Sequence, residues 1–180
     1  AATAYSAAVD ASRELTRQAP NSRYAADARL LAGDGYHQLK RFYEAATEYA
    51  RIVDGRAPLA VRAIAAERLA AIVRNRAITT GALERIRLQL GADRLRDALI
   101  FGEARWYGRL GWAAQSRERS EAYADSIGST GMFYSLVRSG LPGQDLREPA
   151  ATVSVAVATP EETHLDSSTT WAPGSGREDV

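Results

Sequence analysis

The chain of 180 residues contains no cysteine, one methionine, two histidines and a single lysine, Lys40, among 23 basic residues. Without cysteine it forms neither disulfides nor thiolate metal sites. It also lacks the run of about 18 consecutive apolar residues that a membrane span requires, and it has no basic, apolar and cleavable N-terminal pattern. We therefore expect a soluble chain without a transmembrane segment.

Excess charge of either sign is absent too. The 23 basic and 22 acidic residues leave a net charge of +1, and Arg alternates with Asp and Glu along the sequence. Nucleic-acid binding needs a basic face, so we expect no nucleic-acid partner. The hydrophobic content of 46% fits a packed core, and the length fits one domain. Because the first residue is Ala1 rather than methionine, we expect a processed protein or part of a longer one.

What the sequence does contain is a repeated pattern of small residues. One set recurs at spacings of 37, 37 and 34 residues, and a second set lies twelve residues before its last three members. The first set is Ala8, Ala45, Ala82 and Ser116, and the second is Gly33, Ala70 and Ala104. A period in this range is typical of stacked helical hairpins.

Large side chains accompany most of the small ones. Tyr36, Val73 or Tyr107 follows the second set by three residues, and Tyr49, Ile86 or Ser120 follows the first set by four. Two antiparallel helices approach closely where a small residue on one admits a large side chain from the other. The pattern therefore predicts a packing unit made of Gly33, Tyr36, Ala45, Tyr49, Ala70, Ala82, Ala104 and Tyr107.

Residues 20–54 resemble a tetratricopeptide repeat, in the longer-period variety of bacterial envelope proteins. The motif elements in register are Gly33-x2-Tyr36, Ala45, Tyr49 and the turn Pro20-Asn21-Ser22. Lys40 stands where the family usually has glycine. The resemblance implies an all-α, tetratricopeptide-like α-solenoid of stacked antiparallel helical hairpins.

Caps, prolines, glycines and apolar periodicity predict the individual elements. The expected helices cover residues 2–18, 23–39, 41–54, 58–76, 82–90, 93–110 and 113–127, with a short capping helix within 132–139. These helices form a repeat domain over residues 1–139. Residues 140–180 read as a linker and a largely disordered tail, and the alternation T-V-S-V-A-V-A at 152–158 predicts one strand.

The resemblance also implies a binding face, since tetratricopeptide proteins commonly bind extended peptides on the concave face of the first helix of each pair. Matched by position, the face would present Asp34, His37, Gln38, Arg74, Asn75, Arg105 and Arg109. Arginine and asparagine offer several donors to a peptide carboxylate or backbone. The alternative, an unoccupied solvated face, stays open.

Motifs for chemistry are few. His37 and His164 do not form a metal-ligand pattern, and no glycine-rich phosphate loop or nucleophile and base set stands out, so we expect no metal, no cofactor and no enzyme. Gly35 fits either close helix packing or the close approach of a ligand. Trp106 and Trp112 fit packing between helices better than stacking on a sugar or base.

These observations favour a protein-interaction module or scaffold. The resemblance points to the bacterial envelope, in the periplasm or at the periplasmic face of the outer membrane, and to a protein or peptide partner within a larger complex. Similar repeats occur in outer-membrane assembly lipoproteins, cell-division coordinators and penicillin-binding-protein activators. Two alternatives stay open: the helical N-terminal part of a periplasmic ligand-binding or activator protein, whose next domain would start near 152–160, and a structural subunit of a large complex.

Overall fold

The computed structural model describes residues 2–140, which form eight α-helices and one short 3-10 turn. The elements are α1 (Ala2–Gln18), α2 (Ala25–Gln38), α3 (Phe42–Asp54), α4 (Leu59–Arg74), α5 (Thr80–Leu90), α6 (Ala92–Arg109), α7 (Ala113–Ser126), η1 (Gly128–Thr130) and α8 (Tyr134–Arg138). The prediction of an all-helical protein is confirmed for these residues. The tail predicted beyond Gly140, with its strand at 152–158, lies outside the described residues.

Local sequence signals explain where several helices begin and end. Thr79 caps α5, since its hydroxyl accepts a hydrogen bond from the amide of Ala82 at 3.2 Å. Gly91, between α5 and α6, has a φ of 86°, which glycine adopts without a steric penalty. Lys40, between α2 and α3, has a φ of 61°, a left-handed conformation that costs a non-glycine residue about 1–2 kcal/mol.

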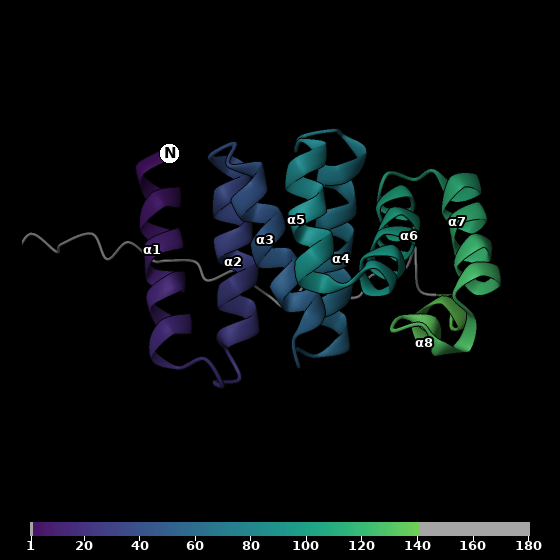
Figure 1. Cartoon of the computed structure of the whole chain (residues 1–180), viewed down its shortest axis with the longest axis horizontal. Helices are drawn as coiled ribbons and strands as arrows, with labels where there is room; N and C mark the ends of the chain where they lie inside the picture. Colours follow the sequence, from purple (N-terminus) through teal and green to yellow (C-terminus); the bar gives the residue numbers. More distant parts are fainter. Residues whose placement is uncertain (1, 141–180) are drawn as a thin grey trace, which may run out of the picture. The chain divides into compact units, whose positions relative to one another are not determined.

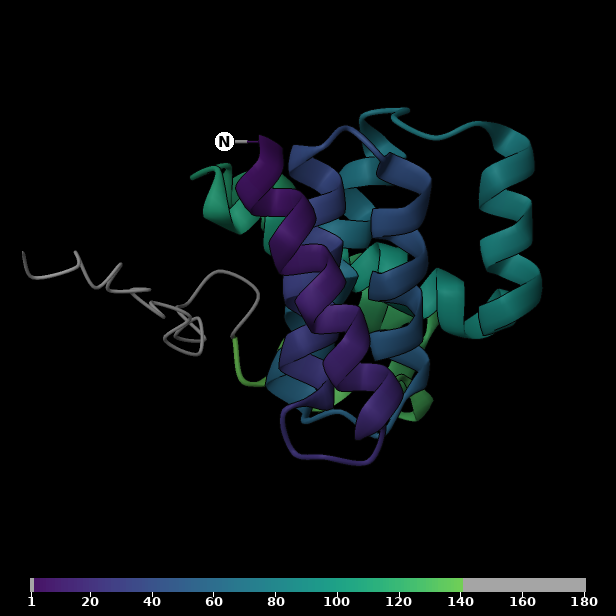
Figure 2. The same cartoon turned by 90° about the vertical axis from the view of Figure 1, so that its left-hand side faces the viewer.

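The helices lie side by side in chain order, with one exception (Figure 1). Each helix from α1 to α3 packs against the next, and α6 packs against α7. The exception is α5, which packs chiefly against α3 and α6, while α4 makes its most extensive contact with α6. Figure 2 shows α5, in teal, standing off to the right of the other helices. The pairing of consecutive helices is thus interrupted between α4 and α5.

Small residues allow the closest helix contacts. A Cβ on Gly102 of α6 would lie 2.2 Å from the carbonyl oxygen of Ala66 and 2.8 Å from Cβ of Ala70, both on α4. A Cβ on Gly33 of α2 would lie 2.5 Å from the ring of Tyr49 on α3. Backbone therefore approaches a neighbouring helix at both glycines, and any side chain there would force the helices apart.

The other residues of the small-residue pattern lie at several different contacts. Between α6 and α7, the Ser116 hydroxyl donates a hydrogen bond to the Ala104 carbonyl oxygen at 2.8 Å. Ala70 lies beside Gly102 of α6, and Ala82 belongs to α5, which packs mainly on α3 and α6. Tyr36, Ala45 and Tyr107 are buried as well, whereas Ala8 of the first set is only partly buried.

A buried polar network attaches the last described segment to α6 and α7. The Tyr123 hydroxyl donates to Asp97 Oδ1 at 2.6 Å and accepts the Phe133 amide at 2.9 Å, and Asp97 Oδ2 accepts the Met132 amide at 2.6 Å. The Phe133 ring stacks on Phe101 with centroids 4.3 Å apart. Both polar side chains are buried and satisfied, so residues 132–138 close the end of the helical row.

We predict that Gly102→Ala destabilises the protein by about 1–3 kcal/mol, because the added methyl group meets the backbone of α4. Urea unfolding followed by circular dichroism measures the change. Gly81→Ala is the matched control, since a Cβ there meets nothing within 4 Å in the first turn of α5. The control should match or exceed wild-type stability. Equal stability of the two variants would contradict the close contact of α4 and α6.

Candidate functional site

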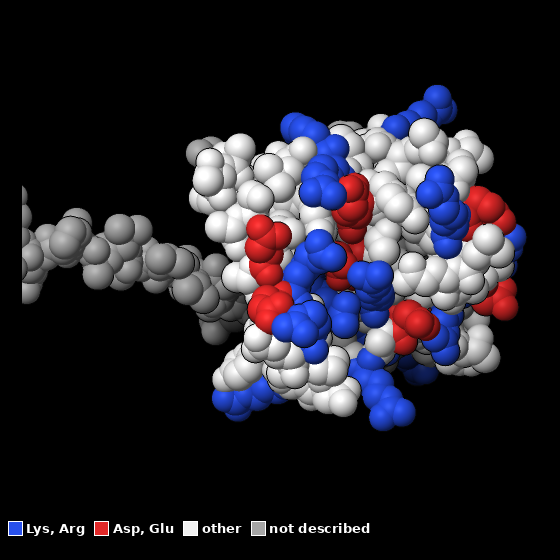
Figure 3. All heavy atoms as spheres, turned by 60° about the vertical axis from the view of Figure 1, so that its left-hand side comes forward, with Lys and Arg blue, Asp and Glu red and all other residues white. Residues whose placement is uncertain are grey.

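The seven polar residues predicted to line a binding face belong to three helices and one helix end. Asp34, His37 and Gln38 lie on α2, Arg74 and Asn75 end α4, and Arg105 and Arg109 lie on α6. On the face drawn in Figure 3, basic and acidic side chains lie beside one another. The seven residues differ strongly in burial and in their partners.

Asp34 joins three helices. Its Oδ1 atom accepts a hydrogen bond from the Tyr49 hydroxyl of α3 at 2.6 Å and lies 3.0 Å from Nη1 of Arg68 on α4. Burial, together with the neighbouring Asp34 carboxylate, raises the pKa of the Tyr49 hydroxyl, so it remains a hydrogen-bond donor. Asp34 is thus engaged with its neighbours and not a carboxylate held out to solvent.

Glu67 forms a second junction, between α4 and α6. Its Oε2 atom lies 2.6 Å from Nε of Arg105, and its Oε1 atom lies 3.0 Å from Nη1 of Arg109. Glu67 is 3% exposed and Arg105 is 4% exposed, whereas the Arg109 side chain is 52% exposed. One end of this cluster is therefore a buried ion pair and the other reaches the surface.

Arg105 is the clearest difference from the sequence-based expectation. The repeat alignment places it on the binding face, but the side chain is buried against Glu67 and cannot meet a partner without breaking that ion pair. Sequence spacing assigns a helix face, yet it does not tell whether a neighbouring helix covers that face. Arg105 therefore has a structural role, in the buried ion pair with Glu67.

Sequence reasoning missed the two residues that organise this face, Glu67 and Arg68. They are adjacent on α4, about 100° apart around the helix, so that one reaches α6 and the other α2. A signal was available, since they are the charged residues within the otherwise apolar stretch 63–73. Charged residues in such a stretch are usually paired when buried.

The more accessible members are Gln38, Arg74, Asn75 and Arg109. Gln38, Arg74 and Asn75 are exposed, whereas His37 is partly buried with its ring edge-on to Phe42 at 5.3 Å between centroids. Burial, followed by the positive charge of Lys40, lowers the pKa of His37. The imidazole is therefore neutral near pH 7.

Two further sequence expectations concerned glycine and tryptophan. A Cβ on Gly35 would lie 2.6 Å from Cγ2 of Val9, so the close approach at this glycine is made by α1. Trp112 stacks on Tyr107 with centroids 5.7 Å apart and is 50% exposed, and Trp106 tilts against the same tyrosine at 5.4 Å. Both tryptophans therefore contact the end of α6.

Other kinds of site were sought across the described residues. Residues 2–140 hold no group of three or more His, Asp or Glu side chains placed to bind a metal ion. None of the helices described here combines the length and the apolar character needed to cross a membrane. Comparisons of the chain with family models, curated proteins and solved structures find no match.

We predict that Glu67→Leu destabilises the protein by about 3–5 kcal/mol, because it leaves Arg105 buried opposite an apolar side chain. Glu67→Leu combined with Arg105→Met should recover most of that loss, since no buried charge remains. Urea unfolding of the single and double variants measures both effects.

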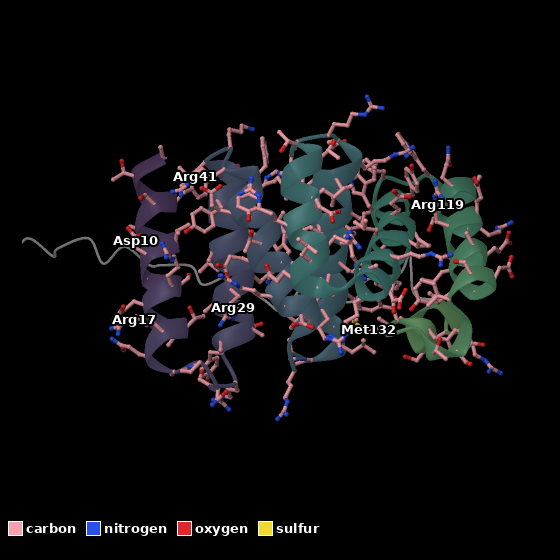
Figure 4. The ribbon with its side chains drawn as sticks, viewed as in Figure 1. Asp10, Arg17, Arg29, Arg41, Arg119 and Met132 are labelled. Atoms are coloured by element: carbon pink, nitrogen blue, oxygen red, sulfur yellow. The ribbon has the colours of Figure 1, made fainter. Side chains whose placement is uncertain are left out.

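The control is Glu103→Gln, which breaks a more exposed ion pair, between Glu103 and Arg119. Of these two residues, Figure 4 labels Arg119. Its expected cost is about 1 kcal/mol or less. A Glu67→Leu variant as stable as this control would show that the buried ion pair contributes little.

We predict that stability falls as the pH is lowered through the range just below 6.5. The lowered pKa of His37 means that the unfolded chain binds a proton there before the folded chain does, so the stability held above pH 6.5 is lost on acidification. His37→Gln should reduce this dependence. His164→Gln, the matched control, should leave it unchanged, and the opposite result would assign the dependence to His164. Urea unfolding at several values between pH 5 and pH 7.5 measures it.

Proposed function

We propose that the chain is a tetratricopeptide-like solenoid that acts as a non-enzymatic protein-interaction module. In this proposal it binds an extended segment of a partner protein along the face shared by α2, α4 and α6. The placement in the bacterial envelope, within a larger complex on the periplasmic side, rests on the sequence resemblance. The close contact of Gly33 with Tyr49 and the row of helices support the solenoid.

The observation that carries the proposal is the set of ion pairs that links the three helices. Asp34 with Arg68 joins α2 to α4, and Glu67 with Arg105 joins α4 to α6. Contacts of this kind hold the helices at a defined spacing. A surface held in its binding geometry loses less conformational entropy when a partner docks.

Accessible side chains around these junctions supply the contacts for a partner. Leu31 and Gln38 lie on one side of α2, which they share with Asp34, already paired with Arg68. Leu31 is 51% exposed, an apolar group of the kind that anchors a peptide side chain. Gln38 and Asn75 offer amide donors and acceptors to a peptide backbone. Arg74 adds a donor for a carboxylate.

The first experiment identifies the partner. A photo-crosslinking amino acid replaces Gln38 on the proposed face, and Gln89 on the exposed side of α5 serves as the matched control position. In cells of the source organism, we expect crosslinks to a defined protein from position 38 and not from position 89. Crosslinks only from position 89 would place the interaction surface elsewhere.

We predict that Arg74→Glu weakens binding of that purified partner about tenfold or more, since it replaces a charge-assisted donor with a repelling carboxylate. Arg117→Glu, an equal charge change on exposed α7, should leave the affinity unchanged within about twofold. Titration calorimetry measures both. Equal weakening by the two reversals would contradict a binding face at α2, α4 and α6. Arg105 is unsuitable for this test, because its reversal would unfold the α4 to α6 contact.

A further inference from the structure

We propose that a second site, at one end of the helices, binds the phosphate group of a small organic molecule. A cavity of about 610 Å³ opens where the α1 to α2 loop meets the α3 to α4 loop. Four arginines line it, and its lining includes no Asp or Glu. They are Arg23, Arg29, Arg51 and Arg56. This site goes beyond the proposed function and does not depend on it.

The local charge exceeds what nearby carboxylates neutralise. Glu48 lies 2.6 Å from Nη1 of Arg51 and 3.6 Å from Nη1 of Arg29, so two guanidinium groups share one carboxylate. Asp54, at the end of α3, pairs instead with Arg94. In a chain whose net charge is only +1, four arginines around one cavity are a marked local excess.

The backbone adds to the positive potential. Ala25 and Ala26, in the first turn of α2, line the cavity, and so does Pro58, which directly precedes α4. The N-cap residues of these two helices, Tyr24 and Pro58, make no side-chain cap hydrogen bond, although the Ser22 hydroxyl accepts the Tyr24 amide at 3.1 Å. Helix N-termini carry partial positive charge and favour anions. Two such ends and four arginine residues therefore border the same space. The Arg23 guanidinium lies over the ring of Tyr24, 4.6 Å from its centroid, and donates a hydrogen bond to the Tyr24 hydroxyl.

A second cavity of similar volume differs from the first in its charged side chains. It measures about 570 Å³ and is lined by three Asp and three Arg residues, so its charges balance. Two of its acidic groups are already committed, since Asp54 pairs with Arg94 and Asp97 accepts hydrogen bonds from Tyr123 and the Met132 amide. Of these two cavities, the one lined by Arg23, Arg29, Arg51 and Arg56 has the larger excess of basic residues over acidic ones.

The chemistry of the lining indicates the class of ligand. A guanidinium presents a planar fork of donors that matches phosphate oxygens. Ile52 and Ala57 supply apolar wall beside the arginines, and the volume exceeds the needs of a lone phosphate ion. Arg29 projects from α2 in Figure 4, and Arg51 from α3 joins it at the shared Glu48. A phosphomonoester or diphosphate with a small organic body fits these features.

Inorganic pyrophosphate is the probe for this site, titrated into the full chain at constant ionic strength by calorimetry. We expect saturable binding to the wild type. The test variant combines Arg23→Gln with Arg56→Gln, two exposed residues in the loops that border the cavity. We expect it to bind pyrophosphate about tenfold or more weakly. Arg117→Gln combined with Arg138→Gln removes the same charge elsewhere on exposed helices and should change binding less than about twofold.

Several results would overturn the proposal. Equal weakening by the two double variants would show general attraction to a cationic surface, and the absence of saturable binding would show no site. The last measurement is binding to vesicles that contain phosphatidic acid. Binding to these vesicles without binding of pyrophosphate would show that the arginines bind a lipid surface instead of a small phosphate compound. None of these outcomes bears on the crosslinking at Gln38 or the titration of Arg74→Glu.

Discussion

The contact between α4 and α6 is the constraint on which most of the described structure depends. At Gly102 the backbone of α6 passes so close to Ala66 of α4 that no Cβ fits between them. Such proximity brings Arg105, one turn further along α6, to the buried carboxylate of Glu67. The packing of small residues and the buried ion pair are therefore two results of the same close approach.

That approach also explains the displacement of α5. A helix has a limited surface, and α4 already contacts α3 on one side and α6 on another. Since α6 occupies the place beside α4, α5 packs against α3 and α6 and stands off from the row (Figure 2). The repeat period in the sequence is regular across this point, but the contacts are not.

The two surfaces proposed for binding differ in how their charged side chains are paired. On the face of α2, α4 and α6, Asp34 and Glu67 each hold arginines in place, so charge there organises helices. At the arginine-lined cavity, Arg29 and Arg51 share Glu48, and Arg23 and Arg56 add further positive charge. The first arrangement favours a defined shape, and the second favours an anion.

Local sequence was sufficient to predict the helices of residues 2–140, because caps, prolines, glycines and apolar periodicity act within a few residues of one another. It also marked Gly33 and Ala104 as small positions. Tertiary structure alone decided that Arg105 is buried, that Glu67 and Arg68 organise the polar face, and that the four arginines from α2, α3 and two loops line one cavity. Each of these depends on which helices become neighbours, and a pattern read along one chain does not contain that information.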